Sequence, residues 1–213
     1  MLTRGSSRCS TIISMFKLIC VTNRGLSPED FLARLDRIVR AKPDGIILRE
    51  KDLEPETYRT LAEQVLHLCR GRGIPCSLHT FSAAGRELGA EGLHLPLSAL
   101  LELDEETRRA FPVLGASCHS AEDAVLAQSL GCTYITAGHV FDTDCKRGLP
   151  GRGLDFLRRV CRAVSIPVYA IGGISAGNLA AVRDAGAAGA CVMSGPMTCQ
   201  DPADYFAALR RAL

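Results

Sequence analysis

Eight short apolar runs recur along the chain, and a segment with helical periodicity follows each of them. The runs are continuous rather than alternating, as expected of parallel strands whose two faces are both covered. They span residues 16–22, 45–49, 75–79, 92–95, 113–117, 133–137, 168–171 and 190–193. Eight strand–helix units with short connections predict an α/β protein, a single closed (β/α)8 TIM barrel.

The segments between the runs carry the signals of amphipathic helices. Apolar side chains share one face in residues 31–39, 61–69 and 154–164. N-caps are predicted at Ser27, with Pro28 in the first helical position, at Ser120, with Asp123 three residues on, and at Ser175. Gly186 predicts the end of a helix.

The main alternative fold is an open, doubly wound sheet. That fold needs a glycine-rich turn after its first strand, whereas residues 22–25 read Thr-Asn-Arg-Gly. No linker divides the 213 residues, so residues 15–213 are predicted to form one barrel. Residues 1–14 are predicted to be a disordered N-terminal extension ahead of a second start at Met15, an interpretation favoured over a transit peptide.

Composition excludes several classes of function. The chain has 25 basic and 23 acidic residues, which gives no reason to expect a nucleic acid or a membrane as partner. No apolar run approaches the ~18 residues of a membrane span. The ten cysteines form no C-x-x-C pair, which argues against a zinc site. We expect buried thiols, such as Cys20, Cys132 and Cys191, in a reducing cytoplasmic compartment, with Cys145 in a polar loop as the exception.

In a barrel the working residues lie at the carboxyl ends of the strands. Arg49 and Lys51 follow the second predicted strand and could hold an anion, although a solvated turn explains them equally well. His119 follows the fifth, and histidine titrates near neutrality, as proton transfer requires. After the sixth comes a long polar loop, residues 138–153, of the kind that binds or covers ligands.

Glycine turns follow the last two predicted strands. Gly172 and Gly173 come after the seventh, and Met193, Ser194 and Gly195 after the eighth. Glycine lets backbone amides approach an anion, and the loops after strands seven and eight form the common phosphate site of barrels. We therefore predict a phosphate held on these amides, without an arginine fork.

From about Phe16 to the C-terminus the sequence resembles the thiamine phosphate synthase and TenI family. The matching segments are residues 48–51 (Leu-Arg-Glu-Lys), 117–120 (Ser-Cys-His-Ser), 138–146 and 171–174, together with Ser194. The resemblance implies a barrel that binds its substrate through Arg49, Lys51, Ser117, Thr143 and Lys146.

The family contains two activities, and departures from the synthase pattern favour the other one. The synthase joins a pyrimidine pyrophosphate to a thiazole phosphate and resembles a magnesium-dependent transferase. Its metal-binding carboxylates align with Thr80 and Ala99 here, and neither side chain replaces the charged oxygens that a hard cation prefers. Ile47 and Cys145 also depart from the synthase, whereas residues 141–153 resemble the TenI branch.

The resemblance thus implies a thiazole tautomerase of thiamine biosynthesis, an isomerase that needs no cofactor and no metal. It would aromatise a thiazole carboxylate phosphate by moving one proton, with His119 as the acid–base group and His79 or His94 as alternates. The implied partner is a small phosphorylated thiazole, and a homo-oligomer is expected. Two alternatives stay open: a working synthase using Mg²⁺, and a non-catalytic paralogue that binds a thiazole or thiamine phosphate.

Overall fold

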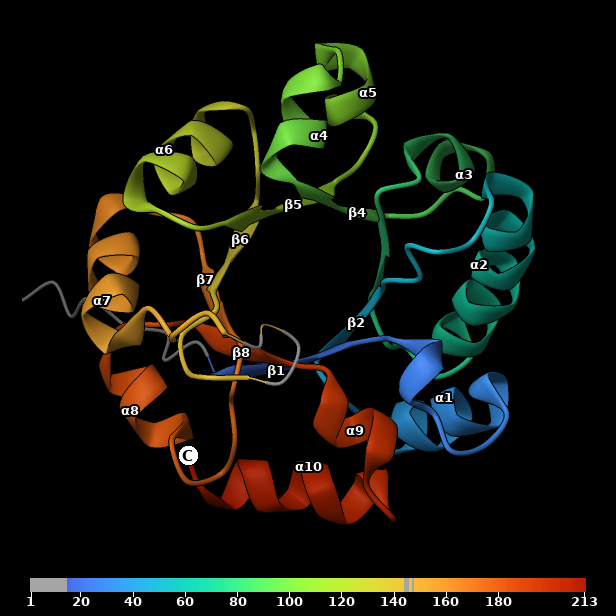
Figure 1. The fold of residues 1–213 in the computed structure, drawn as a ribbon. Coiled ribbons are helices and arrows are strands. Elements are labelled where there is room, and N and C mark those ends of the chain that lie inside the picture. Colours follow the sequence, from blue (N-terminus) through green and yellow to red (C-terminus); the bar gives the residue numbers. More distant parts are fainter. Residues whose placement is uncertain (1–14, 144–145, 147) are drawn as a thin grey trace, which may run out of the picture.

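A computed structural model describes residues 15–143, 146 and 148–213. Its parallel strands pair in sequence order and the eighth closes on the first, so the sheet is a complete barrel (Figure 1). The strands are β1 (Lys17–Val21), β2 (Gly45–Leu48), β3 (Cys76–His79), β4 (Gly92–Pro96), β5 (Val113–Cys118), β6 (Tyr134–Gly138), β7 (Val168–Ile171) and β8 (Gly189–Val192). The predicted (β/α)8 barrel is confirmed, and each strand lies within one residue of its predicted bounds.

Helices cover the outside of the barrel, which explains why the strands are apolar on both faces (Figure 1). They are η1 (Arg24–Leu26), α1 (Phe31–Arg40), α2 (Pro55–Arg70), α3 (Ser82–Glu87), α4 (Leu97–Glu102), α5 (Glu105–Arg109), α6 (Ala121–Ser129), α7 (Gly153–Ala163), α8 (Leu179–Asp184), α9 (Ser194–Thr198) and α10 (Pro202–Arg211). The short α9 follows β8 and packs against η1 and α10.

Large side chains fill the interior of the barrel. Tyr134 and Tyr169 lie with ring centroids 5.3 Å apart, in a buried cluster with Ile19, Val21, Ile47 and Cys191. Gly115 makes room for Tyr134, because a Cβ at position 115 would lie 2.2 Å from Cζ of that ring. The top of this cluster forms the floor of the cavity described below.

Two predicted helix caps are wrong. Asp30, not Ser27, caps α1, because its carboxylate accepts a hydrogen bond from the Ala33 amide at 3.0 Å. Ser175 does not open α8, since a turn held by Asn178 comes first.

Two other predicted ends are confirmed. The Ser120 hydroxyl accepts a hydrogen bond from the Asp123 amide at 3.0 Å and caps α6. Gly186, with φ +99°, ends α8.

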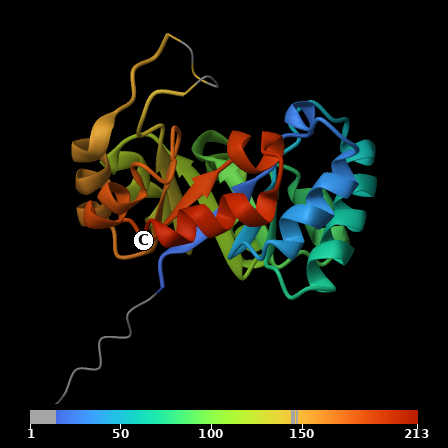
Figure 2. The same cartoon turned by 90° about the horizontal axis from the view of Figure 1, so that it is seen from below.

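The loop between β6 and α7 stands above the barrel at the carboxyl end of the strands (Figure 2). Residues 144, 145 and 147 of this loop lie outside the described residues, and so do the predictions for Cys145 and for the extension 1–14. Cys20, Cys132 and Cys191 are buried, as predicted. Within the described ranges, no helix is long and apolar enough to cross a membrane.

Candidate active site

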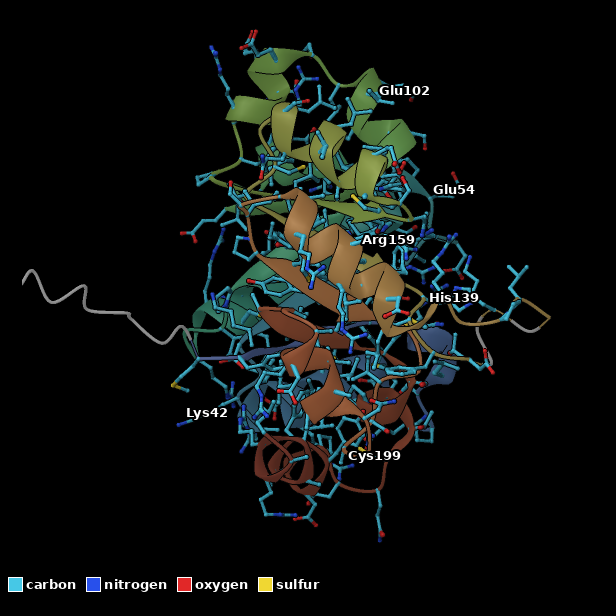
Figure 3. All side chains as sticks on the ribbon, turned by 90° about the vertical axis from the view of Figure 1, so that its left-hand side faces the viewer. Lys42, Glu54, Glu102, His139, Arg159 and Cys199 are labelled. Atoms are coloured by element: carbon cyan, nitrogen blue, oxygen red, sulfur yellow. The ribbon has the colours of Figure 1, made fainter. Side chains whose placement is uncertain are left out.

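A cavity of about 510 Å³ opens at the carboxyl ends of the strands, and all eight strands contribute to its wall. Figure 3 shows His139 and Glu54 at this end of the barrel and Lys42 at the opposite end. The structure brings together every residue predicted for the site: Arg49, Lys51, Ser117, His119, Thr143, Lys146, Gly172, Gly173, Met193, Ser194 and Gly195 all line the cavity. Their roles remain predictions.

Arg49 and Lys51 line the cavity just after β2, whereas Glu50 between them turns away from it. Glu50 is 2 % exposed, and its carboxylate accepts hydrogen bonds from the Thr22 hydroxyl at 2.6 Å and the Arg24 amide at 2.9 Å. Thr22 Oγ1 in turn accepts a hydrogen bond from the Arg49 amide at 2.9 Å. These buried bonds fix the backbone that carries the two cations.

Lys146, from the loop after β6, adds a third cation to the wall. The pKa of Lys51 is lowered first by burial and then by the positive charges of Arg49 and Lys146, so the three groups share one electrostatic environment. Among the lining residues that the structure describes, none is Asp or Glu. A concave wall with one sign of charge attracts ligands of the opposite sign, here anions.

His119 follows β5 at the start of α6. Its Nδ1 lies 2.8 Å from the Gly138 carbonyl oxygen, which can only accept a hydrogen bond. Nδ1 therefore carries a proton, and Nε2 is the atom that can accept one when the ring is neutral. The His119 amide donates to the Asp123 carboxylate at 2.7 Å, so the N-terminus of α6 fixes the backbone beneath this ring.

Two further histidines lie deeper in the cavity wall. Burial, followed by His94, Lys51 and Arg49, lowers the pKa of His79 to about 2. Burial, followed by Lys51, lowers the pKa of His94 to about 3. His94 is hydrogen-bonded through Nδ1 to the Tyr134 hydroxyl at 3.0 Å and through Nε2 to Ser117 Oγ at 2.9 Å. Both rings are neutral at physiological pH, and the two ring nitrogens of His94 are already engaged.

The turn after β7 forms the opposite wall. Gly172 and Gly173 have φ values of +96° and +67°, in the left-handed region that favours glycine. The loop after β6 packs directly on them, because a Cβ at position 173 would lie 2.5 Å from the Asp142 carbonyl oxygen. Glycine is required here for both conformation and space, and it leaves backbone rather than side chains as the wall.

The first residues of α9 complete that wall. Met193, Ser194 and Gly195 line the cavity directly after β8. Gly195 packs on Tyr205 of α10, since a Cβ at position 195 would lie 2.2 Å from the Tyr205 hydroxyl oxygen. The first amides of a helix have no partner within it and can bind an anion.

The residues present do not fit a divalent cation. Across the described part of the chain, no group of three or more His, Cys, Asp and Glu residues is placed to hold a metal ion. Thr80, with φ +73°, has its hydroxyl oxygen 2.6 Å from His79 Nδ1, and Ala99 lies in α4. Mg²⁺ prefers charged oxygen ligands, which these two positions do not supply.

Sequence reasoning missed some residues of the wall. Tyr205 comes from α10, far from any strand end, and no sequence signal marks it. His139, just after β6, also lines the cavity, with Nε2 3.2 Å from the Leu149 carbonyl oxygen. Thr136 could have been found, because strand alternation places it on the same face of β6 as the buried Tyr134.

The fold and the position of the cavity define a (β/α)8 barrel with a cavity at the carboxyl ends of its strands, where barrel enzymes have their active sites. A family described as thiamine monophosphate synthase matches residues 18–195. The thiamine-phosphate synthase of Thermus thermophilus is 35% identical over 198 residues, covering 92% of this chain and 95% of that relative. That of Desulfitobacterium hafniense is 31% identical over 194 residues, covering 88% and 92%. The chain belongs to the thiamine monophosphate synthase family.

A solved structure leads to the same family. The thiamine phosphate pyrophosphorylase of Pyrococcus furiosus superposes with a TM-score of 0.80 at 27% identity, covering 93% of this chain and 96% of that one. The resemblance predicted from the motifs is thus confirmed, and the enzyme names of these relatives support the expectation of a biosynthetic enzyme. The same names favour the synthase over the tautomerase.

Proposed function

We propose that this protein is an enzyme of thiamine biosynthesis that aromatises a phosphorylated thiazole carboxylate by proton transfer, a thiazole tautomerase. The observation that carries this proposal is the state of His119. Its Nδ1 is bonded to the Gly138 carbonyl, which leaves Nε2 as a base in a cavity lined by cations and, over the described residues, by no carboxylate.

One imidazole is sufficient for the proposed reaction. Nε2 of His119 accepts the proton from ring C2, so that one C–H bond breaks, and the imidazolium returns a proton to the exocyclic carbon, where a new C–H bond forms. The electrons of the broken bond enter the ring, which becomes aromatic, and there is no net oxidation. General acid–base catalysis of this kind contributes about 10²–10⁴-fold to the rate.

The two walls of the cavity are suited to the two anionic ends of such a substrate. Arg49, Lys51 and Lys146 bind the carboxylate and stabilise the negative charge that spreads into the ring in the transition state. The glycine turn after β7 and the start of α9 bind the phosphate through backbone amides. Ser117 and Thr143 complete the substrate contacts.

The second candidate is a thiamine phosphate synthase, and the names of the relatives favour it. A cationic wall suits a pyrophosphate as well as a carboxylate. Against this candidate stands the poor fit of the cavity to a divalent cation, because Thr80 and Ala99 replace the carboxylates expected of a synthase. The composition of the cavity therefore supports the isomerase, and family membership supports the transferase.

Two assays on the purified protein separate the candidates. The first follows aromatisation of the thiazole carboxylate tautomer by its ultraviolet absorbance, with EDTA and with added Mg²⁺. The second follows pyrophosphate release from pyrimidine pyrophosphate and thiazole phosphate. We expect turnover in the first assay, unchanged by EDTA, and none in the second. Mg²⁺-dependent pyrophosphate release would establish the synthase instead, and binding without turnover in either assay would indicate a non-catalytic paralogue.

A further inference from the structure

Arg34 of α1 is one of the largest fully buried side chains of the described chain, with 1 % of its surface exposed. It does not line the cavity. A buried guanidinium is rare and is stable only where its donors are satisfied. The hydrogen-bond partners of Arg34 therefore show which segments its guanidinium holds together.

Those contacts join α1 to the far end of α9. The Arg34 Nε donates to the Pro196 carbonyl oxygen at 3.0 Å, and Nη2 donates to the Cys199 carbonyl oxygen. Nη2 also lies 3.2 Å from Cys199 Sγ, and Nη1 lies 3.2 Å from Glu29 Oε1. The guanidinium thus bonds two carbonyls that point out of the C-terminal end of α9, more than 160 residues away in sequence.

The other end of α9 is the part of the cavity wall that begins with Ser194. A helix of five residues is too short to be stable without tertiary support. Tyr205 packs on Gly195 from one side, and Arg34 bonds the last carbonyls from the other. The guanidinium therefore holds the end of α9 that lies opposite its first amides.

We propose that Arg34 is a positioning residue for phosphate binding, which aims the amides of Ser194 and Gly195 into the cavity from the opposite end of α9. Its positive charge also lies at the carbonyl end of the helix, where a cation is favourable. The proposal rests on the phosphate site of the proposed function, and it holds for either reaction, because both substrates carry a phosphate.

Arg37, one turn further along α1, provides a matched control. It bonds the same Glu29 at 2.9 Å and the carbonyl oxygen of Gln200 at 2.6 Å, which lies beyond the end of α9. Its side chain is 41% exposed. A loss of general contacts between α1 and the α9–α10 segment would affect both arginines, whereas a role in aiming α9 belongs to Arg34 alone.

The test compares the wild type with Arg34→Met, Arg34→Lys and Arg37→Met. Each folded protein is titrated with inorganic phosphate by calorimetry, well below its thermal midpoint, and amide NMR shifts of Ser194 and Gly195 locate the site. We expect Arg34→Met to weaken phosphate binding by ~10-fold, because two charge-assisted bonds to α9 are lost. The phosphate affinity of Arg34→Lys should lie between those of the wild type and Arg34→Met, since a single ammonium cannot bond both carbonyls. Arg37→Met should bind phosphate as tightly as the wild type does.

Steady-state kinetics give an independent reading. A positioning role predicts a raised KM with a smaller change in kcat for the Arg34 variants, and partial rescue by lysine. If Arg34→Lys, or a folded Arg34→Met, binds phosphate as tightly as the wild type, the proposal is overturned. If the wild type binds phosphate without NMR shifts at Ser194 and Gly195, the phosphate site of the proposed function is wrong. If those shifts appear but all variants bind phosphate equally, the site is right and only the role of Arg34 is wrong.

Discussion

The two walls of the cavity offer different groups to the anionic substrate of the proposed function. The wall at β2 offers side-chain cations, Arg49 and Lys51, whereas the wall at β7 and β8 offers backbone amides beside Gly173 and Gly195. Long side chains can reorient, so the first wall needs its backbone fixed, and the buried Glu50 does this. The position of a backbone amide is determined by the fold. The second wall therefore needs space next to its amides, which its glycines leave, and contacts that hold α9 in place.

This difference indicates how each wall responds to change. On the cationic wall a substitution removes a charge or loosens its support, and the effect depends on charge. On the amide wall any added Cβ meets backbone or ring atoms, and the effect depends on shape. The predictions below test that contrast, beginning with His119, which belongs to neither wall.

The largest effect is expected for His119→Asn. Because Nε2 is the proposed base, kcat should fall by about 10²–10⁴-fold with little change in KM. His139→Asn is the matched control, since His139 lines the same cavity. Stopped-flow or steady-state assays of aromatisation measure both. Near-wild-type turnover in His119→Asn, with loss in His79→Asn or Lys51→Ala, would show that the base is misassigned.

On the amide wall, Gly173→Val should raise KM by roughly 10- to 100-fold, because a side chain there forces the turn against the Asp142 carbonyl and out of its left-handed conformation. Gly177→Ala is the control, since the nearest atom to its added Cβ lies 3.8 Å away, in ordinary contact. Phosphate titration and KM report the effect. Equal KM values for the two variants would remove the turn after β7 from the phosphate site.

On the cationic wall, Glu50→Gln should raise KM by about 3- to 10-fold at low ionic strength. The glutamine amide offers one acceptor oxygen where the carboxylate offers two, so the Thr22 and Arg24 donors compete for it. Asp52→Asn is the control, because the Asp52 carboxylate is exposed and bonds the Arg24 side chain rather than its backbone amide. A KM for Glu50→Gln that matches the control would mean that the buried carboxylate does not orient Arg49 and Lys51.

The smallest effect concerns stability rather than activity. Burial lowers the pKa of His79 to about 2 and of His94 to about 3, against 6.5 for a free imidazole. The unfolded chain therefore binds more protons between about pH 3 and 6.5, and stability falls as the pH is lowered through that range, by at most about 1.4 kcal/mol per pH unit for each ring.

Urea unfolding at pH 7, 6 and 5 measures this slope. His94→Asn should flatten it, whereas the exposed His67→Asn should not. A wild-type stability that is constant from pH 7 to pH 5 would contradict neutral, buried imidazoles in the cavity wall.

Much of the fold and of the rim was predictable from sequence for a physical reason. Strands buried on both faces are continuous apolar runs, and parallel strands bring their carboxyl ends to one rim, so residues after the runs, such as His119 and Gly173, had to meet. Caps were predicted from adjacent residues in both cases. Ser120 is the only capping side chain in its segment and was right, whereas Asp30 follows three residues after Ser27 and caps α1 in its place.

The supporting residues were not predictable. Arg34 reads as one more polar residue on the surface of an amphipathic helix, and only the closed barrel brings α9 against it. Glu50 reads as an acid in a charged turn, because nothing in the sequence tells that Thr22 lies 2.6 Å away. Contacts between elements far apart in sequence depend on how the chain closes, which periodicity does not report.

Thr80 has a consequence for how this family can diverge. A β-branched residue is an outlier at φ +73°, whereas asparagine and aspartate adopt the left-handed region far more readily. The backbone after β3 is therefore already shaped for an acidic residue that this chain does not carry. A single side-chain replacement, Thr80→Asp, would therefore add a carboxylate at this rim on an unchanged backbone, and it would relieve a conformational constraint rather than impose one.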